Sequence, residues 1–144
     1  MNTDEISGNN IDDDNDGYVD DVNGWNAYNS NGNISSDGHG THVAGTVGAE
    51  GNNGSMVVGV NWNVKLMIVM GSTGQTSIAL EAYGYVLDQR VLYNDTTGEQ
   101  GAFVVATNSI FGIYNDDCFL GNYPVLDAAY TALEQARNLI QAAT

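Results

Sequence analysis

The chain has 144 residues, with 18 acidic residues against three basic ones, a net charge of −15 and 42% apolar residues. This length suits one domain that buries roughly 70% of the surface exposed by the unfolded chain, and the negative charge excludes nucleic acid and anionic membrane surfaces as partners. No apolar stretch approaches the ~20 residues of a membrane span, and polar residues follow Met1 where a secretory signal would be apolar.

The first 38 residues are predicted to form a loop region. They are rich in Asn, Asp, Gly and Ser and show neither helical nor strand periodicity. Eight of the first 21 residues are acidic and none is basic, and such crowding of carboxylates requires cations. The eight are Asp4, Glu5, Asp12, Asp13, Asp14, Asp16, Asp20 and Asp21.

The stretch that begins at Asp12 has the spacing of a calcium-binding loop. Oxygen-bearing residues stand at positions 1, 3, 5 and 9, a glycine stands at position 6 for the sharp turn, and position 7 offers a backbone carbonyl. Position 12 is Asn23 instead of the usual glutamate, so either Asp21 replaces it or the site is weaker. The alternative is an acidic, solvated turn. The predicted Ca²⁺ ligands are Asp12, Asp14, Asp16, Tyr18, Asp20 and Asp21.

Regular elements are expected from residue 39 onward. The small residues of His39–Gly48 predict a short buried helix lying close to a sheet. The further expected elements are a strand at Val64–Met70, a helix at Ser77–Tyr93, a strand at Phe103–Thr107, a helix from Pro124 to Ala136 and a strand at Leu139–Ala143. Their alternation predicts an α/β fold, a three-layer arrangement of a parallel sheet flanked by helices. We expect one domain over residues 1–144, with a calcium-binding loop region at 1–38 and an α/β core at 39–144.

The segment from His39 to Thr46 carries the candidate catalytic residue. It reads His-Gly-Thr-His-Val-Ala-Gly-Thr. Its first seven residues resemble, without a mismatch, the histidine motif of the subtilisin family of serine peptidases (subtilases), and the resemblance implies that His39 is the general base and that His42 is structural. Such an imidazole takes the proton of a serine hydroxyl and later gives it to the leaving amine. The alternatives are ordinary helix-start histidines or a metal-binding pair, although a third nearby ligand for a metal is missing.

The resemblance covers nearly the whole chain and is to bacterial subtilases with a calcium-binding insertion. The further similar segments are residues 2–6, 8–14, 17–26, 59–65, 71–74 and 104–109. In this family, extended backbone around 71–76 and 109–112 pairs with the substrate peptide. The substrate-binding residues that this implies are Gly71, Gly74, Ser109 and Gly112. The alternative is that these glycines only punctuate loops, and Ile110 departs from a serine that is common in the family.

The other two residues of the subtilase triad have no counterpart in this sequence. The family's nucleophile lies in a Gly-Thr-Ser-Met-Ala string and its aspartate in an Asp-Thr-Gly or Asp-Ser-Gly string, and neither occurs here. Gly54-Ser55-Met56 imitates the first, but Ser55 follows His39 too closely and precedes no helical pattern. By resemblance we expect the aspartate upstream of Met1 and the serine downstream of Thr144. A general base without a nucleophile cannot perform acyl transfer.

Two functional interpretations follow. In the first, the chain is a segment of a secreted or extracellular subtilisin-like endopeptidase of peptides and proteins, inactive alone, with its signal outside this chain. In the second, it is a non-catalytic, calcium-stabilised structural module.

In subtilases, the strand that bears the aspartate lies between those matching Val64–Met70 and Phe103–Thr107. Without that strand, the two either pair directly or accept a strand from another chain by self-association or donation. Donation is favoured, since Met1–Ile11 is too polar to fill the gap.

Overall fold

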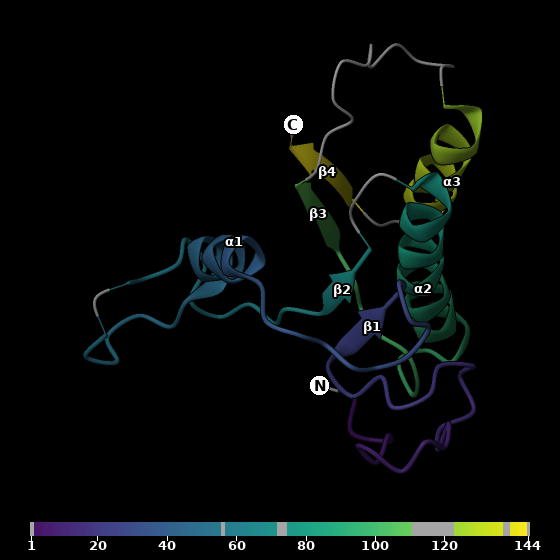
Figure 1. The fold of residues 1–144 in the computed structure, drawn as a ribbon, viewed down its shortest axis with the longest axis horizontal. Helices are drawn as coiled ribbons and strands as arrows, with labels where there is room; N and C mark the ends of the chain where they lie inside the picture. Colours follow the sequence, from purple (N-terminus) through teal and green to yellow (C-terminus); the bar gives the residue numbers. More distant parts are fainter. Residues whose placement is uncertain (1, 56, 72–74, 111–122, 137–138, 144) are drawn as a thin grey trace.

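The computed structural model describes residues 2–55, 57–71, 75–110, 123–136 and 139–143, the last range by its backbone alone. Within these ranges the polypeptide forms three helices and four short strands (Figure 1). In sequence order they are β1 (Gly24–Asn26), α1 (Gly38–Gly48), β2 (Ile68–Met70), α2 (Thr76–Asp95), β3 (Ala106–Ile110), α3 (Pro124–Gln135) and β4 (Leu139–Ala143). The α/β class predicted from the sequence is confirmed. None of the described helices is long and apolar enough to cross a lipid bilayer.

The strands form two parallel pairs. β1 lies beside β2, with Gly24 opposite Ile68, and β3 lies beside β4, with Ala106 opposite Leu139. Within the described residues, β2 and β3 are not hydrogen-bonded to each other, although α2 connects them. Direct pairing of these two strands, one of the two outcomes considered from the sequence, is therefore not formed.

Two strands begin later in the sequence than expected, because each is regular only where a neighbouring strand pairs with it. The strand expected at Val64–Met70 is regular only over β2, since β1 offers just three residues for pairing. The strand expected at Phe103–Thr107 begins later, at Ala106, where β4 lies beside it. β1 itself lies in the region expected to be loop, and all three of its residues are buried.

The hydrophobic core gathers around α2. Buried side chains from α2, α3 and the segment of β1 meet along this helix, which packs against α3 at one end and near the N-terminal loop at the other (Figure 1). The buried apolar residues are Trp25, Ala27, Ala79, Tyr83, Tyr85, Val86, Leu126 and Leu133. Tyr18, Trp25 and Tyr85 form an aromatic cluster, with ring centroids 4.8 Å apart for Tyr18–Trp25 and Tyr18–Tyr85. The N-terminal loop is thereby fixed to α2.

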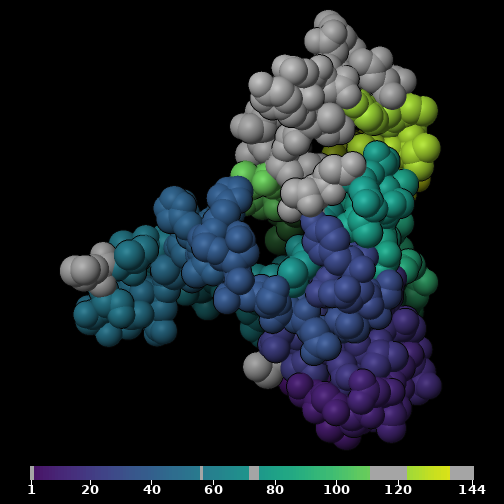
Figure 2. All heavy atoms as spheres, viewed as in Figure 1, coloured from purple at the N-terminus to yellow at the C-terminus, as the bar shows by residue number. Residues whose placement is uncertain are grey.

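Residues 38–66, which we call the arm, extend away from this core (Figures 1 and 2). The arm contains α1, whose C-terminal carbonyls accept hydrogen bonds from the segment that returns past it, including Gly59 N to Ala49 O at 2.9 Å and Val60 N to Thr46 O at 3.0 Å. A Cβ on Gly59 would lie 2.4 Å from the Ala49 nitrogen, so this approach needs glycine. The helix was expected to be buried, which is wrong: none of its residues is. Gly48 packs against the returning segment near Val64, whereas no described atom outside the helix's own backbone lies within 4 Å of the Cβ position of Gly45, so the returning segment covers only part of the helix.

Candidate calcium site and catalytic histidine

Side-chain-to-backbone hydrogen bonds fold the Asp12–Tyr18 segment into a ring. The Asp12 carboxylate accepts from the backbone nitrogens of Asp16 at 3.1 Å and Gly17 at 2.9 Å. Asp14 accepts from the Asp16 nitrogen at 3.2 Å, and Asp16 accepts from the Tyr18 nitrogen at 2.9 Å. Gly17 has a φ of +97°, which L side chains rarely adopt. Carboxylates that turn back onto their own loop in this way bring oxygens together at its centre.

Glu5 joins two of these aspartates in a group suited to a metal ion. One carboxylate oxygen from each of Glu5, Asp12 and Asp14 lies within 4.8 Å of the others. Glu5 is buried, and it also accepts from the backbone nitrogens of Asp13 at 2.6 Å and Asp20 at 2.9 Å. Three such oxygens repel one another unless a cation lies among them, and oxygen donors are those that Ca²⁺ prefers. The residues present therefore fit a Ca²⁺ ion.

Sequence reasoning did not assign Glu5 to the site. It lies seven residues before the first position of the loop pattern, and only its membership of the acidic run distinguished it.

Asp20 and Asp21, which the sequence assigned as ligands, are not part of the group of three. Asp20 instead accepts hydrogen bonds from the backbone nitrogens of Gly8 at 2.7 Å, Asn9 at 3.2 Å and Asn10 at 3.1 Å. Its carboxylate thus holds the preceding turn in place.

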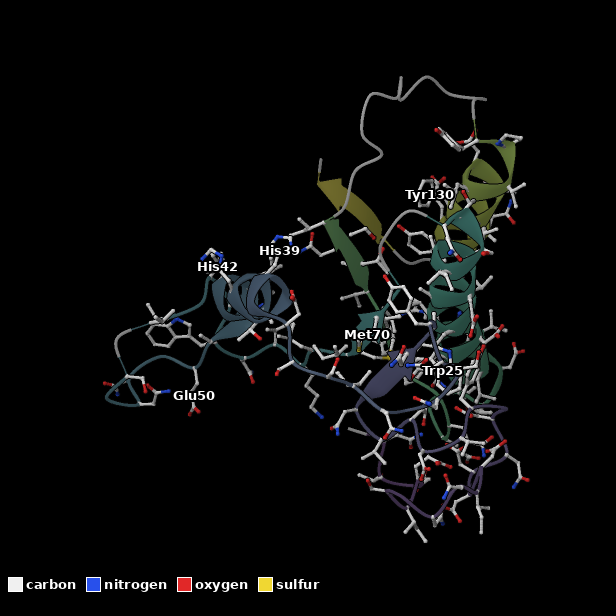
Figure 3. All side chains as sticks on the ribbon, in the orientation of Figure 1. Trp25, His39, His42, Glu50, Met70 and Tyr130 are labelled. Atoms are coloured by element: carbon white, nitrogen blue, oxygen red, sulfur yellow. The ribbon has the colours of Figure 1, made fainter. Side chains whose placement is uncertain are left out.

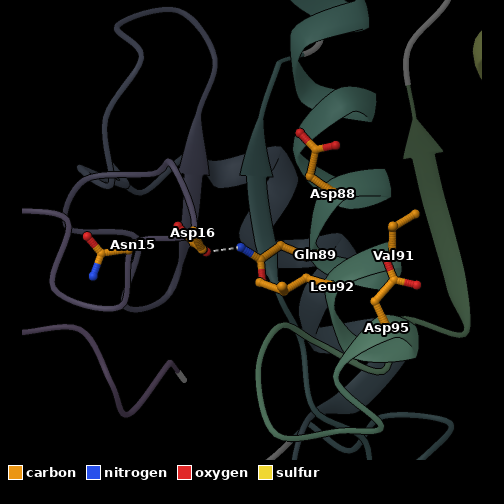
Figure 4. A pocket seen from close by; sticks show the side chains of 7 residues that line it. All are labelled: Asn15, Asp16, Asp88, Gln89, Val91, Leu92 and Asp95. Atoms are coloured by element: carbon orange, nitrogen blue, oxygen red, sulfur yellow. Dashed lines mark hydrogen bonds between the residues drawn. The ribbon is translucent and has the colours of Figure 1, made fainter.

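Asp21 is buried against α2. The Tyr85 hydroxyl donates to its carboxylate at 2.8 Å, and the Asn2 amide donates at 2.8 Å. The Gln89 amide donates to both Asp21, at 3.3 Å, and Asp16 (Figure 4). Burial raises the pKa of Asp21 and raises that of Asp16 from 3.8 to about 7. These two carboxylates connect the loop to the helix through neutral donors.

A shallow hollow lies between the loop and α2. Its volume is about 250 Å³, and Figure 4 shows the side chains that surround it. The residues that line it are Asn15, Asp16, Asp88, Gln89, Val91, Leu92 and Asp95. The Tyr18 hydroxyl donates to Asp88 at 2.6 Å, so this residue also joins the loop to α2. The loop and the helix therefore share an acidic surface.

The candidate general base lies on the arm. Asp37 caps α1 by accepting from the Gly40 nitrogen at 2.9 Å, and this hydrogen bond, with a contribution from His39, lowers the Asp37 pKa. His39 lies in the first turn of α1, and both it and His42 are exposed (Figure 3). Within the described residues, neither imidazole makes a hydrogen bond to a serine or a carboxylate. The described residues thus present an imidazole without its triad partners.

None of the remaining described candidates is hydrogen-bonded to the His39 imidazole. Ser55 is exposed at a turn of the arm, where its nitrogen donates to the Asn53 side chain at 2.9 Å. Gly71 is buried where a Cβ would lie 2.4 Å from that of Ala82. The Ser109 hydroxyl accepts from Tyr83 at 2.8 Å. Gly74 and Gly112 lie outside the described residues.

Comparison with known proteins identifies the family. The family model for subtilases matches residues 2–138. The chain is similar to subtilisin-like protease 1 of Plasmodium falciparum (isolate 3D7), with 54% identity over 59 residues, which are 40% of this chain and 9% of that protein. The Plasmodium vivax protein of that name is 51% identical over 59 residues, which are 40% of this chain and 9% of that protein. The Plasmodium berghei (strain Anka) protein is 47% identical over 70 residues, which are 47% of this chain and 12% of that protein. The matched segments are thus about a tenth of these relatives. Since the family model spans most of the sequence, this chain belongs to the subtilase family.

Proposed function

We propose that this chain is a calcium-stabilised segment of a secreted or extracellular subtilisin-like serine endopeptidase and that it supplies the general base, His39. The observation that carries the proposal is the uninterrupted His39–Gly45 motif, which begins in the first turn of an exposed helix inside the region matched by the family model. Peptides and proteins are the proposed substrates. The proposed substrate-contacting residues are Gly71, Gly74, Ser109 and Gly112.

The role of His39 is to accept a serine proton and then to protonate the leaving amine of the peptide bond. The imidazole is accessible to a partner because it is exposed and makes no hydrogen bond within the described residues. No described serine is hydrogen-bonded to this imidazole. Ser109 is bonded to Tyr83, and the Ser55 nitrogen donates to Asn53. We therefore propose that the nucleophile and the orienting aspartate come from polypeptide outside this chain, and that the chain alone is inactive.

Ca²⁺ is proposed as the stabilising cofactor. Glu5, Asp12 and Asp14 would hold the ion, and Asp16 and the Tyr18 carbonyl belong to the same ring of the loop. When bound, the ion would neutralise the carboxylates that otherwise repel one another. The millimolar Ca²⁺ found outside cells is sufficient even for a weak site, which agrees with the proposed extracellular location.

The general-base role is tested in a chimera in which residues 2–138, the part matched by the family model, replace the corresponding part of the subtilase domain of the Plasmodium falciparum relative. Peptide hydrolysis by the chimera should be lost on His39→Ala, by at least about a thousandfold. His42→Ala is the matched control, because it removes the neighbouring imidazole from the same helix. Equal losses from the two substitutions would contradict a specific role for His39.

A simpler assay tests the proposed inactivity of the chain alone. Purified protein incubated with a fluorogenic peptide should release no more product than its His39→Ala variant. Hydrolysis that Ser55→Ala abolishes would contradict the proposal and would make Ser55 a nucleophile.

The second candidate function is a non-catalytic module that assembles by strand complementation. Its support is an apolar stripe at alternate positions, the pattern of a strand with one buried face. These side chains are exposed instead, with Val60 at 89% and Trp62 at 60%. The stripe consists of Val58, Val60, Trp62, Val64, Leu66 and Ile68. A strand donated by another polypeptide between β2 and β3 would cover part of it and pair the open edges.

Sedimentation velocity over a concentration series tests this candidate. Strand complementation predicts a defined oligomer, or a stable complex with the polypeptide that supplies the strand. A monomer at every concentration that also binds no other segment of the parent protein would contradict it.

A further inference from the structure

Three Asn-Gly pairs occur in the sequence, and the structure places them in different environments. They are Asn23-Gly24, Asn31-Gly32 and Asn53-Gly54. In such a pair the glycine nitrogen can attack the amide carbon of the asparagine, because glycine has no Cβ to shield its nitrogen. A new C–N bond closes a succinimide ring, and the bond between the amide carbon and the amide nitrogen of the asparagine breaks. The proton lost by the glycine nitrogen passes through solvent to the departing nitrogen, which leaves as ammonia. One water then opens the ring to aspartate or isoaspartate.

Backbone hydrogen bonds and packing protect Gly24 and Gly32. The Gly24 nitrogen donates to Asp21 O at 3.0 Å, and a Cβ at this position would lie 1.8 Å from Ile68 O. The Gly32 nitrogen donates to Val19 O at 3.1 Å, and its Cβ position is 1.7 Å from Asp20 O. Attack by either nitrogen requires these bonds to break and the backbone to move, so local unfolding must precede the reaction.

Asn53-Gly54 has neither protection. Both residues are exposed at a turn of the arm, and the Gly54 nitrogen makes no hydrogen bond within the described residues. Apart from Gly54 and its two chain neighbours, no described atom lies within 4 Å of the Cβ position of Gly54, so no packed segment obstructs movement of this turn.

The Asn53 side chain is also held near the reacting bond. Its carbonyl oxygen accepts from the Ser55 nitrogen at 2.9 Å, which folds the amide back along the Asn53–Gly54 peptide. The same hydrogen bond draws electron density from the amide carbon of Asn53 and makes it a better electrophile.

From these contacts we propose that Asn53 is a site of spontaneous deamidation, through a succinimide, in the folded protein. Asn23 and Asn31 react more slowly under the same conditions. The arm carries one acidic and one basic residue, Glu50 and Lys65, so the reaction changes its net charge from zero to −1. Isoaspartate additionally lengthens the backbone by one carbon at the turn.

The test is an incubation of the folded protein at mildly alkaline pH, followed by mass spectrometry of its peptides. Trypsin leaves all three pairs in the peptide that ends at Lys65, so cleavage before aspartate is needed to separate Asn53 from the other two. Asn53 should lose ammonia and gain water roughly tenfold faster than Asn23 or Asn31, because only those two require a hydrogen bond to break. The reaction should accelerate with pH, since the Gly54 nitrogen attacks after losing its proton.

Two controls separate the structural cause from the sequence. In denaturant the three pairs should react at similar rates, since the protecting contacts are gone. Asn53→Gln should stop the reaction at this position, because the longer glutamine forms a six-membered ring much more slowly. The proposal is overturned if Asn23 or Asn31 reacts as fast as Asn53 in the folded protein, or if Asn53 reacts only in denaturant.

Discussion

Asp21 is a buried carboxylate that depends on neutral hydrogen-bond donors. Its exposure is 1%, and its described side-chain donors are Tyr85, Asn2 and Gln89. No described basic residue forms an ion pair with it. Burial consequently raises its pKa, and the three donors offset part of the cost of removing the carboxylate from water.

Tyr85→Phe should lower the free energy of unfolding by about 1–3 kcal/mol, because it removes the shorter of the two hydrogen bonds to a buried carboxylate oxygen of Asp21 while keeping the aromatic ring. Urea unfolding followed by fluorescence measures the change. Tyr93→Phe is the matched control on the same helix, since the Tyr93 hydroxyl makes no hydrogen bond within the described residues. An equal effect of the two substitutions would show that the Asp21 contact contributes nothing.

Without a bound metal ion, the Asp12–Tyr18 loop should respond to pH with a definite sign. Burial raises the Asp16 pKa from 3.8 to about 7, so over this window the folded state binds more protons than the unfolded state. Stability without calcium should therefore fall as pH rises from about 4 to about 7. Calcium competes with those protons, so the stabilisation it provides should increase over the same window.

Thermal melts in chelator and in excess calcium across this window check both trends. Asp16→Asn should flatten the pH dependence in chelator, whereas Asp95→Asn, an exposed neighbour on α2, should not. A gain in melting temperature from calcium that is constant with pH would argue against a titrating Asp16 in the site. Absence of any gain would argue against the calcium site itself.

The elements predicted best were those that local sequence determines. The helix expected at Ser77–Tyr93 forms as α2, and the one expected from Pro124 ends one residue early, since periodicity and an initiating proline act within a few turns. Strand limits depend on a distant partner, which is why residues 64–67 are irregular although three of the four are apolar. Glu5 was missed for the same reason: the fold, and not a spacing, brings it beside Asp12 and Asp14. The roles assigned to His39 and to the calcium ligands remain predictions.

Charge and apolar surface are unevenly distributed over the whole molecule. The net charge is −15, yet the arm has a net charge of zero, with Glu50 and Lys65 its only charged residues apart from its histidines. The apolar stripe of Val58, Val60, Trp62, Val64, Leu66 and Ile68 starts on this neutral arm. Repulsion between acidic cores and attraction between apolar arms therefore oppose each other.

Added salt should promote association of the protein, because it screens the repulsion and leaves the apolar attraction. Sedimentation velocity at rising sodium chloride concentration measures this effect. Val60→Glu should suppress the association, whereas Val125→Glu, a similarly apolar and exposed position on α3, should suppress it less. Association that is insensitive to salt, or equally sensitive to both substitutions, would exclude the arm as its cause.

The bonds between the N-terminal loop and α2 make the helix a reporter of metal binding. Tyr85, Asp88 and Gln89 lie within two turns of α2, and each is hydrogen-bonded to a residue of the loop. Any ion that orders the loop thus also raises the free energy needed to open this part of the helix. Amide hydrogen exchange along α2 should slow on calcium addition from Tyr83 to Val91, although no residue of that helix belongs to the proposed ligand set. The same linkage means that substitutions on α2 can weaken calcium affinity without altering a single ligand.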